Sequence, residues 1–223
     1  MRNDKPSSPS EHLDSLTKRY PTLFPVRRNI EAAFNLLHAS YRAGGKLLLC
    51  GNGGSACDAE HITGELMKSF LLKRPLTKDD QSMLSAFGED GADLAATLQG
   101  ALPAIPLTGM TGLSSAFAND ADPALTFAQQ AWALTKPNDV ILCISTSGDA
   151  RNCRLAAIAA KVRGAAVIGL TGAGGGKLTP LCDALIAVPE TSTAYVQELH
   201  LPVYHALCAM LEATFFSQSE VEA

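Results

Sequence analysis

Residues 47–66 constrain the fold of this chain more than any other stretch. They begin with the apolar run Leu47–Cys50, continue through the sequence Gly-Asn-Gly-Gly-Ser, and end in a segment with helical character. A short apolar run that stops at a glycine-rich turn is typical of a buried parallel strand. Ser55 is a favourable N-cap, so we expect the next helix to begin there. The stretch therefore predicts a strand, a tight turn and a helix, which is the repeating unit of an α/β fold.

The junction between this strand and this helix has the chemistry of an anion site. Free backbone N–H groups and the positive end of a helix dipole converge there, and phosphate is the anion that such a site most often binds. The same turn can also be a plain connection. His61 and Glu65 stand four residues apart and share one face of the helix, near whatever the turn binds. Such a pair is also found on ordinary solvated surfaces, so its meaning depends on its place beside the turn.

The pattern of strand and helix recurs along the chain. Four further apolar runs predict strands at residues 104–108, 140–144, 165–170 and 184–188, with helical segments between them. Five strands that alternate with helices predict one five-stranded parallel sheet with helices on both faces. Ligands of such sheets lie beyond the carboxyl ends of the strands, which is where the polar turns of this chain fall.

The second polar turn, residues 145–149, presents three hydroxyl groups in succession. Ser145, Thr146 and Ser147 precede a glycine and a predicted helix, so they can bind phosphate with side chains and backbone together. They can equally cap the helix. Neither turn has the spacing of a dinucleotide fingerprint or a P-loop. Two such turns on one edge of a sheet favour a phosphorylated small molecule as the ligand.

The last predicted helix, residues 191–216, carries polar side chains among apolar ones. Gln197 and His205 stand eight residues apart, so they can face roughly the same side of the helix. Pro202 lies between them and removes one helical hydrogen bond. A histidine in this setting is either a catalytic residue or a core residue with its hydrogen bonds satisfied.

Two segments lie outside this repeating pattern. At the N-terminus we predict a helix that Ser10 caps, followed by a second helix over residues 25–42, with apolar faces that suit a partner subunit. After the first helix of the sheet comes the connection 68–100, in which only residues 93–98 read as helical. Connections this long are uncommon in α/β units. A functional lid and a tolerated surface insertion are both consistent with it.

Composition excludes several classes of function. The net charge of −4 and the absence of a basic run argue against partners such as nucleic acid or an anionic membrane surface. No apolar run approaches the length of a membrane span, and the polar N-terminus lacks the apolar region of a signal peptide, so we expect a cytoplasmic protein. Six cysteines without a Cys-x-x-Cys pair argue against a zinc ribbon.

Several separate motifs together resemble the sugar isomerase (SIS) domain family, and within it the isomerases of sedoheptulose 7-phosphate. They are Cys50–His61 with Glu65, Ile144–Gly148, Leu170–Gly172 with Gly175–Lys177, and Val196–His200. The similarity keeps the same order from about residue 25 to residue 215. The resemblance implies a flavodoxin-like αβα sandwich and a homotetramer with sites between subunits.

The resemblance also divides the chain. It implies a SIS domain over residues 25–216 with an insertion at residues 71–102. Residues 1–24 then form an N-terminal tail and a short helix, and residues 217–223 form a C-terminal tail.

The activity that the resemblance implies is an aldose–ketose isomerisation. Sedoheptulose 7-phosphate would become D-glycero-D-manno-heptose 7-phosphate through an enediol, with Glu65 and His205 as the acid/base pair. The residues that match a zinc site are His61, Glu65, Gln197 and His205. The residues that match substrate contacts are Asn52, Gly53, Ser55, Asp120, Ser145, Thr146, Ser147 and Gln197.

Three positions depart from the family pattern. Ala150 replaces a serine that usually binds phosphate, Ala194 replaces an aspartate that usually contacts substrate, and Tyr195 replaces an arginine. These changes leave room for an isomerase of another phosphosugar. A third hypothesis is a non-catalytic SIS module that binds a phosphosugar or a replication initiator. The four residues that match the acid/base and zinc set favour the enzyme.

Overall fold

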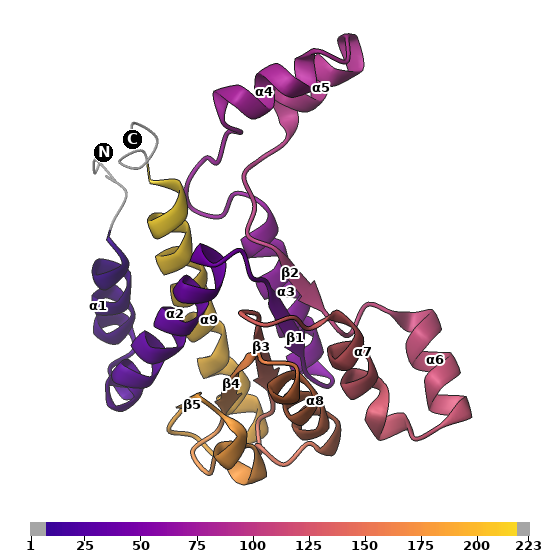
Figure 1. The fold of residues 1–223 in the computed structure, drawn as a ribbon. Helices are drawn as coiled ribbons and strands as arrows, with labels where there is room; N and C mark the ends of the chain where they lie inside the picture. Colours follow the sequence, from indigo (N-terminus) through magenta and orange to yellow (C-terminus); the bar gives the residue numbers. More distant parts are fainter. Residues whose placement is uncertain (1–7, 218–223) are drawn as a thin grey trace.

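The computed structural model describes residues 8–217 and contains one parallel sheet (Figure 1). Its strands are β1 (Leu47–Cys50), β2 (Ala104–Pro106), β3 (Val140–Ile144), β4 (Ala166–Thr171) and β5 (Ala184–Ala187). They lie in the order β2-β1-β3-β4-β5, and all four neighbouring pairs are parallel. The five-stranded parallel sheet of the sequence prediction is therefore confirmed, and Pro106 lies in an edge strand, where a missing ladder donor is tolerated.

The helices form a layer on each face of this sheet. Their bounds are α1 (Pro9–Arg19), η1 (Pro21–Val26), α2 (Arg27–Arg42), α3 (Gly54–Met67), α4 (Lys78–Ser85), α5 (Glu89–Thr97), α6 (Thr111–Asp120), η2 (Pro123–Leu125), α7 (Thr126–Leu134), α8 (Arg151–Val162), η3 (Gly176–Leu181) and α9 (Thr193–Phe216). None of the helices within residues 8–217 combines the length and hydrophobicity that crossing a membrane requires.

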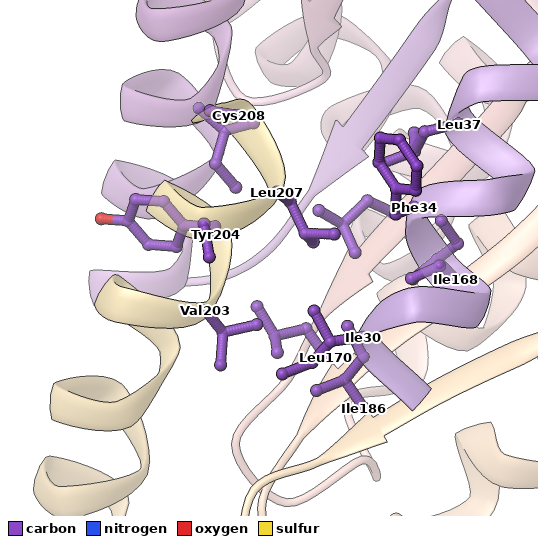
Figure 2. Packing of buried hydrophobic residues seen from close by; sticks show 14 of the residues in the cluster. Ile30, Phe34, Leu37, Ile168, Leu170, Ile186, Val203, Tyr204, Leu207 and Cys208 are labelled. Carbon is purple, nitrogen blue, oxygen red and sulfur yellow. The ribbon is translucent and has the colours of Figure 1, made fainter. Parts of the chain in front are cut away.

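Two hydrophobic cores lie on opposite faces of the sheet. The larger core joins α2, α3 and α9 to the side chains of Leu47 and Leu49, and Figure 2 shows part of it between α2, the strands and α9. The smaller core joins α7 and α8 to Leu48 and Cys50. Alternate residues of β1 thus serve opposite cores, as the geometry of a strand requires. This is the αβα sandwich that the resemblance implies.

Both helix starts predicted from serine are displaced by one or two residues. Ser8, not Ser10, caps α1, because its Oγ accepts a hydrogen bond from the Glu11 N–H while the Glu11 carboxylate accepts one from the Ser8 N–H. Helix α3 begins one residue before Ser55, and its N-cap is Gly53 at a φ of 55°, a conformation that favours glycine. Ser55 is buried in the first turn instead.

The insertion contains two helices rather than the one predicted. α4 and α5 pack against each other as a hairpin that projects from the body of the molecule (Figure 1). Thr77 caps α4 by accepting a hydrogen bond from the Asp80 N–H at 3.1 Å. At the root of the hairpin, Pro75 and Gln99 form an isolated antiparallel bridge. α4 has no buried residue, so its sequence lacked the apolar stripe on which a helix prediction depends.

Candidate functional site

The two polar turns meet at the switch point of the sheet. The chain passes from β1 to the edge strand β2 and then returns to pair β3 with the other side of β1. The turns that follow β1 and β3 therefore leave adjacent strands at the same edge, where ligands of such sheets bind. Asn52 lies in the first polar turn and Asn152 in the first turn of α8, directly after the second polar turn. Two amide hydrogen bonds of 2.9 and 2.8 Å join them. The predicted meeting of the two turns is thus confirmed, and Asn152 is a member of the site that the sequence did not reveal.

The turn after β3 is held from behind by the turn after β4. Gly148 has a φ of 70° and lies so close to the backbone of Gly175 that a side chain at this position would clash. The N–H of Gly172 donates to the carbonyl of Thr146 at 2.9 Å. Ser145 is buried, whereas Ser147 is exposed and accepts a hydrogen bond from the Asp149 N–H through Oγ at 3.1 Å. Ser147 therefore already stabilises its own turn.

Arg151 begins α8 directly after this turn, next to Ala150. Its guanidinium donates to the Asp122 carboxylate at 2.7 Å, which fixes a positive charge beside the turn. The hydrogen bond from the backbone N–H of Ala124, together with this contact, lowers the pKa of Asp122. Asp120 ends α6 and accepts a hydrogen bond from its neighbour Asn119 at 3.0 Å. Figure 1 shows α6 beyond α7, away from α9. Asp120 thus stands two residues before Asp122, the partner of Arg151, on a helix that lies apart from α9 and its His205.

The acid/base candidates come together where α3 packs against α9. His61 Nε2 lies 3.2 Å from Glu65 Oε1 and 3.5 Å from His205 Nε2. The rings of His61 and His205 meet edge to face at 5.0 Å between centroids. The His61 side chain is 42% exposed and that of Glu65 is 13% exposed, so the group faces solvent while its carboxylate is mostly covered. Three residues chosen by spacing and resemblance thus form one cluster.

Lys68 is a charged neighbour of this cluster that the sequence analysis missed. Its ammonium group lies 3.0 Å from Glu65 Oε2, the carboxylate oxygen that does not face His61. The ammonium group and the carboxylate therefore form an ion pair at the edge of the cluster. The spacing of three residues on one helix was a signal for this pair, since such residues are neighbours on a helix surface.

His205 lies on the wall of a recess between α1 and α9. The recess has a volume of about 370 Å³ and is also lined by Arg19 and Phe70. The Phe70 ring lies 5.5 Å from the His205 ring. Burial lowers the pKa of His205, and the charges of His61 and Arg19 lower it further against the opposing effect of Glu65. The surroundings of His205 therefore favour its neutral form.

Gln197 lies nearer to the first polar turn than to the histidines. Its side-chain amide packs against Gly54, where any β-carbon would collide with it. Gly54 stands seven residues before His61 on α3, which corresponds to roughly 10 Å along the helix axis. The structure thus brings Gln197 to the start of α3 beside the first polar turn, whereas the contacts of His61, Glu65 and His205 lie farther along that helix.

The residues proposed for zinc fit the ion in their chemistry. Imidazole nitrogens and carboxylate oxygens are ordinary zinc ligands, and two donors on a tetrahedral zinc ion lie ~3.4 Å apart. The distances from His61 Nε2 to Glu65 and His205 match that spacing. Within residues 8–217, however, no group of three or more His, Cys, Asp or Glu side chains is already arranged to hold a metal. His61 thus forms one pair with Glu65 and another with His205, each with a spacing that suits zinc, but the three side chains do not form a preassembled metal site.

A buried ion pair lies next to this cluster and contacts the backbone of Glu65. Arg74 and Glu212 are both fully buried and lie 2.7 Å apart. The Glu212 carboxylate accepts hydrogen bonds from the backbone N–H groups of Phe70, Leu71 and Leu72. The Arg74 guanidinium also donates to the carbonyl of Glu65 at 3.0 Å. The pair thus ties the end of α3 to α9, and no local spacing in the sequence signalled it.

The chain is similar to known proteins along most of its length. Models of the SIS domain match residues 25–87 and 113–215. A phosphoheptose isomerase of Rhodospirillum rubrum is 39% identical, covering 82% of this chain and 84% of that protein. One of Roseiflexus sp. is 37% identical, covering 86% of this chain and 88% of that protein.

Solved structures agree with these sequence relatives. The phosphoheptose isomerase of Neisseria gonorrhoeae has a TM-score of 0.70 at 30% identity, covering 91% of this chain and 96% of that one. That of Francisella tularensis has a TM-score of 0.69 at 29% identity, covering 91% of this chain and 95% of that one.

Proposed function

The chain belongs to the SIS domain family, and from this we propose that it is an isomerase that converts sedoheptulose 7-phosphate to D-glycero-D-manno-heptose 7-phosphate. Relatives that are 37% and 39% identical over most of their length carry the name phosphoheptose isomerase. The observation that carries the proposal is the contact of His61 with both Glu65 and His205. An aldose–ketose isomerase needs an acid and a base on one side of the sugar, and this contact supplies them.

Proton transfer between C1 and C2 of the open-chain sugar assigns a role to each group. The Glu65 carboxylate lies beside the Lys68 ammonium group, and we assign it the role of the base that takes the proton from C1 of the ketose and returns it to C2. Burial favours the neutral form of His205, so its N–H can donate to the C2 carbonyl oxygen as the enediol forms. The same nitrogen then takes back the proton from O1 as the C1 carbonyl forms. The product is the aldose, and no net proton is consumed.

The phosphate group would bind at the other end of α3. Gly53 and Ser55 lie at the start of that helix, where backbone N–H groups and the helix dipole favour an anion. Ser145 and Thr146 belong to the neighbouring turn that Asn52 joins to the first. The roughly 10 Å between the start of α3 and His61 suits an extended seven-carbon sugar with a terminal phosphate.

Zinc remains part of this proposal. His61, Glu65 and His205 would hold the ion, with Gln197 as a fourth ligand if its side chain leaves Gly54. When bound, zinc would supply a Lewis acid that polarises the sugar oxygens. Metal analysis of the purified protein checks the proposal, and full isomerase activity in metal-stripped protein would show that the ion is not required.

The test of the function is an NMR assay in deuterated water. Purified protein with sedoheptulose 7-phosphate should produce the aldoheptose phosphate and incorporate deuterium at C2. Folded, zinc-supplied protein that gives neither product nor exchange would overturn the assignment, and other ketose phosphates would then be assayed. The predicted homotetramer is checked separately by light scattering on the same preparation.

A further inference from the structure

Tyr204 is a buried residue that contacts the acid/base cluster without being part of it. Its ring is 2% exposed and packs in the core beside α9. Figure 2 shows that its hydroxyl oxygen points away from the labelled core side chains. That oxygen lies 3.0 Å from His61 Nδ1, the ring nitrogen opposite the one that faces Glu65 and His205. Tyr204 therefore touches the back of the central histidine.

The same hydroxyl donates a hydrogen bond to Asp58. The distance from Tyr204 Oη to Asp58 Oδ1 is 3.2 Å. Asp58, His61 and Glu65 stand at positions i, i+3 and i+7 of α3, so all three lie along one helix face. The other carboxylate oxygen of Asp58 is buried and has no hydrogen-bond partner within the described residues. Asp58 therefore depends on the tyrosine for its side-chain hydrogen bond in the described structure.

The hydrogen bonds that run from His61 through Tyr204 to Asp58 determine which ring nitrogen of His61 carries the hydrogen. A phenol has one proton to donate, and an ionised carboxylate can only accept. Tyr204 donates its only hydroxyl hydrogen to Asp58 in a hydrogen bond. Its oxygen must therefore accept a hydrogen bond from His61, and Nδ1 of His61 must carry the hydrogen. In a neutral imidazole the other nitrogen is then a bare electron pair. The chain thus selects one of the two tautomers of His61.

The selected tautomer determines what Nε2 of His61 can bind on the side that faces Glu65 and His205. The Nε2 electron pair of His61 faces a carboxylate oxygen at 3.2 Å and an imidazole nitrogen at 3.5 Å. This electron pair and the Glu65 oxygen repel each other unless a cation lies between them. A proton or a zinc ion meets that need, and only the tautomer with hydrogen on Nδ1 leaves Nε2 free to bind either.

We propose that Tyr204 and Asp58 are positioning residues that hold His61 in the tautomer with hydrogen on Nδ1, so that Nε2 binds the cation shared with Glu65 and His205. The inference rests on the proposed function for its role in the reaction. The tautomer itself is a property of the free protein. Its test is therefore independent of whether the substrate is correctly assigned.

The first readout is the ¹⁵N chemical shifts of His61 in the full-length, metal-free protein at mildly alkaline pH. The native protein should show hydrogen on Nδ1. Tyr204→Phe removes the hydroxyl and should shift His61 toward a mixture of tautomers or toward hydrogen on Nε2. Asp58→Asn should do the same, because an amide can donate to the tyrosine and so lets the phenol proton turn toward His61.

The second readout is zinc affinity, measured by competition with a chelator. Loss of a residue that orients a metal-bound histidine typically weakens binding by about 10–100-fold, and we expect that loss in Tyr204→Phe. Tyr41→Phe is the matched control, because it also removes a buried phenol hydrogen bond, from Tyr41 to the Pro103 carbonyl, in another part of the core.

Two results would overturn the proposal. One is an unchanged His61 tautomer in Tyr204→Phe, and the other is a loss of zinc affinity no greater than in Tyr41→Phe. Native protein that shows the Nδ1 tautomer but has no isomerase activity would instead count against the proposed function and leave the positioning role in place.

Discussion

The end of α3, where it packs against α9, lies shortly before the α4–α5 hairpin in sequence, but the two regions are built in opposite ways. Where α3 packs against α9, Arg74 and Glu212 are fully buried, and their side chains form hydrogen bonds with the backbone of Glu65 and Phe70. In the second, Gly91 is the only buried residue of the two helices, and Phe87 at the tip is 82% exposed. A site that must hold acid and base in place needs the first kind of construction. An insertion that the sheet can tolerate needs only that its own ends remain fixed.

The largest expected difference between the two regions concerns catalysis. Glu65→Gln should lower isomerase turnover by about 10²–10⁴-fold, because an amide cannot take the proton from C1. Glu89→Gln, which makes the same change in the hairpin, should leave turnover unchanged. Steady-state kinetics with circular dichroism as a fold control measures both. Substantial turnover in Glu65→Gln would remove Glu65 from the mechanism.

The next difference concerns stability. Arg74→Met should lower the free energy of unfolding by about 3–5 kcal/mol, because it leaves the Glu212 charge buried without its partner. Lys78→Met in the exposed first turn of α4 should change it by no more than about 0.5 kcal/mol. Urea denaturation of the two variants makes the comparison. Similar midpoints would show that the buried pair does not support the α3–α9 contact.

Acidification should expose a further difference, through His200. Burial lowers the pKa of this fully buried histidine to about 4, against 6.5 for an unperturbed group. Its neutral form is favoured in the folded state, so its contribution to stability is present above pH 6.5 and is lost as the pH falls toward 4. The loss from this group amounts to about 3 kcal/mol.

Unfolding measurements at several pH values check this expectation. In His200→Gln the free energy of unfolding should depend less on pH between 6.5 and 4, because the variant has no ring to protonate. An identical pH dependence in the two proteins would assign the acid sensitivity to other groups.

The smallest expected effect is that of removing the hairpin. A short glycine–serine linker in place of residues 76–98 should leave turnover within about twofold and the midpoint of thermal unfolding within a few degrees. The bridge between Pro75 and Gln99 holds the two ends together, so a short linker can join them. A tenfold or greater loss of turnover in folded protein would make the hairpin a lid and end the contrast.

Much of the fold was predictable because its signals are local. The apolar run of β1, the glycine-rich turn and the helix that follows all act within twenty residues, and the structure confirms them. The hairpin was not, since α4 lacks a buried face that would mark it as a helix. Pairs such as Arg74 with Glu212 and Asp58 with Tyr204 join residues far apart in the chain. Only the folded chain brings such partners together.

Within the candidate site the same distinction holds. His61 and Glu65 were found by their spacing, and the resemblance to SIS domains identified His205 on a distant helix. Asp58 stands three residues before His61, so the helical stripe was visible in the sequence. The role of Asp58 could not be predicted, because it depends on Tyr204 of α9, whose hydroxyl connects Asp58 to His61.

The bridge between Pro75 and Gln99 also bears on how such a protein can change over generations. Because the two ends of the hairpin meet, a gene can gain, lose or lengthen the coding segment between them without moving a strand or a site residue. Such a change has little effect on the packing of the rest of the molecule, and the exposed tip of the hairpin can vary in sequence. New recognition can therefore arise on the hairpin while selection holds the sheet edge unchanged.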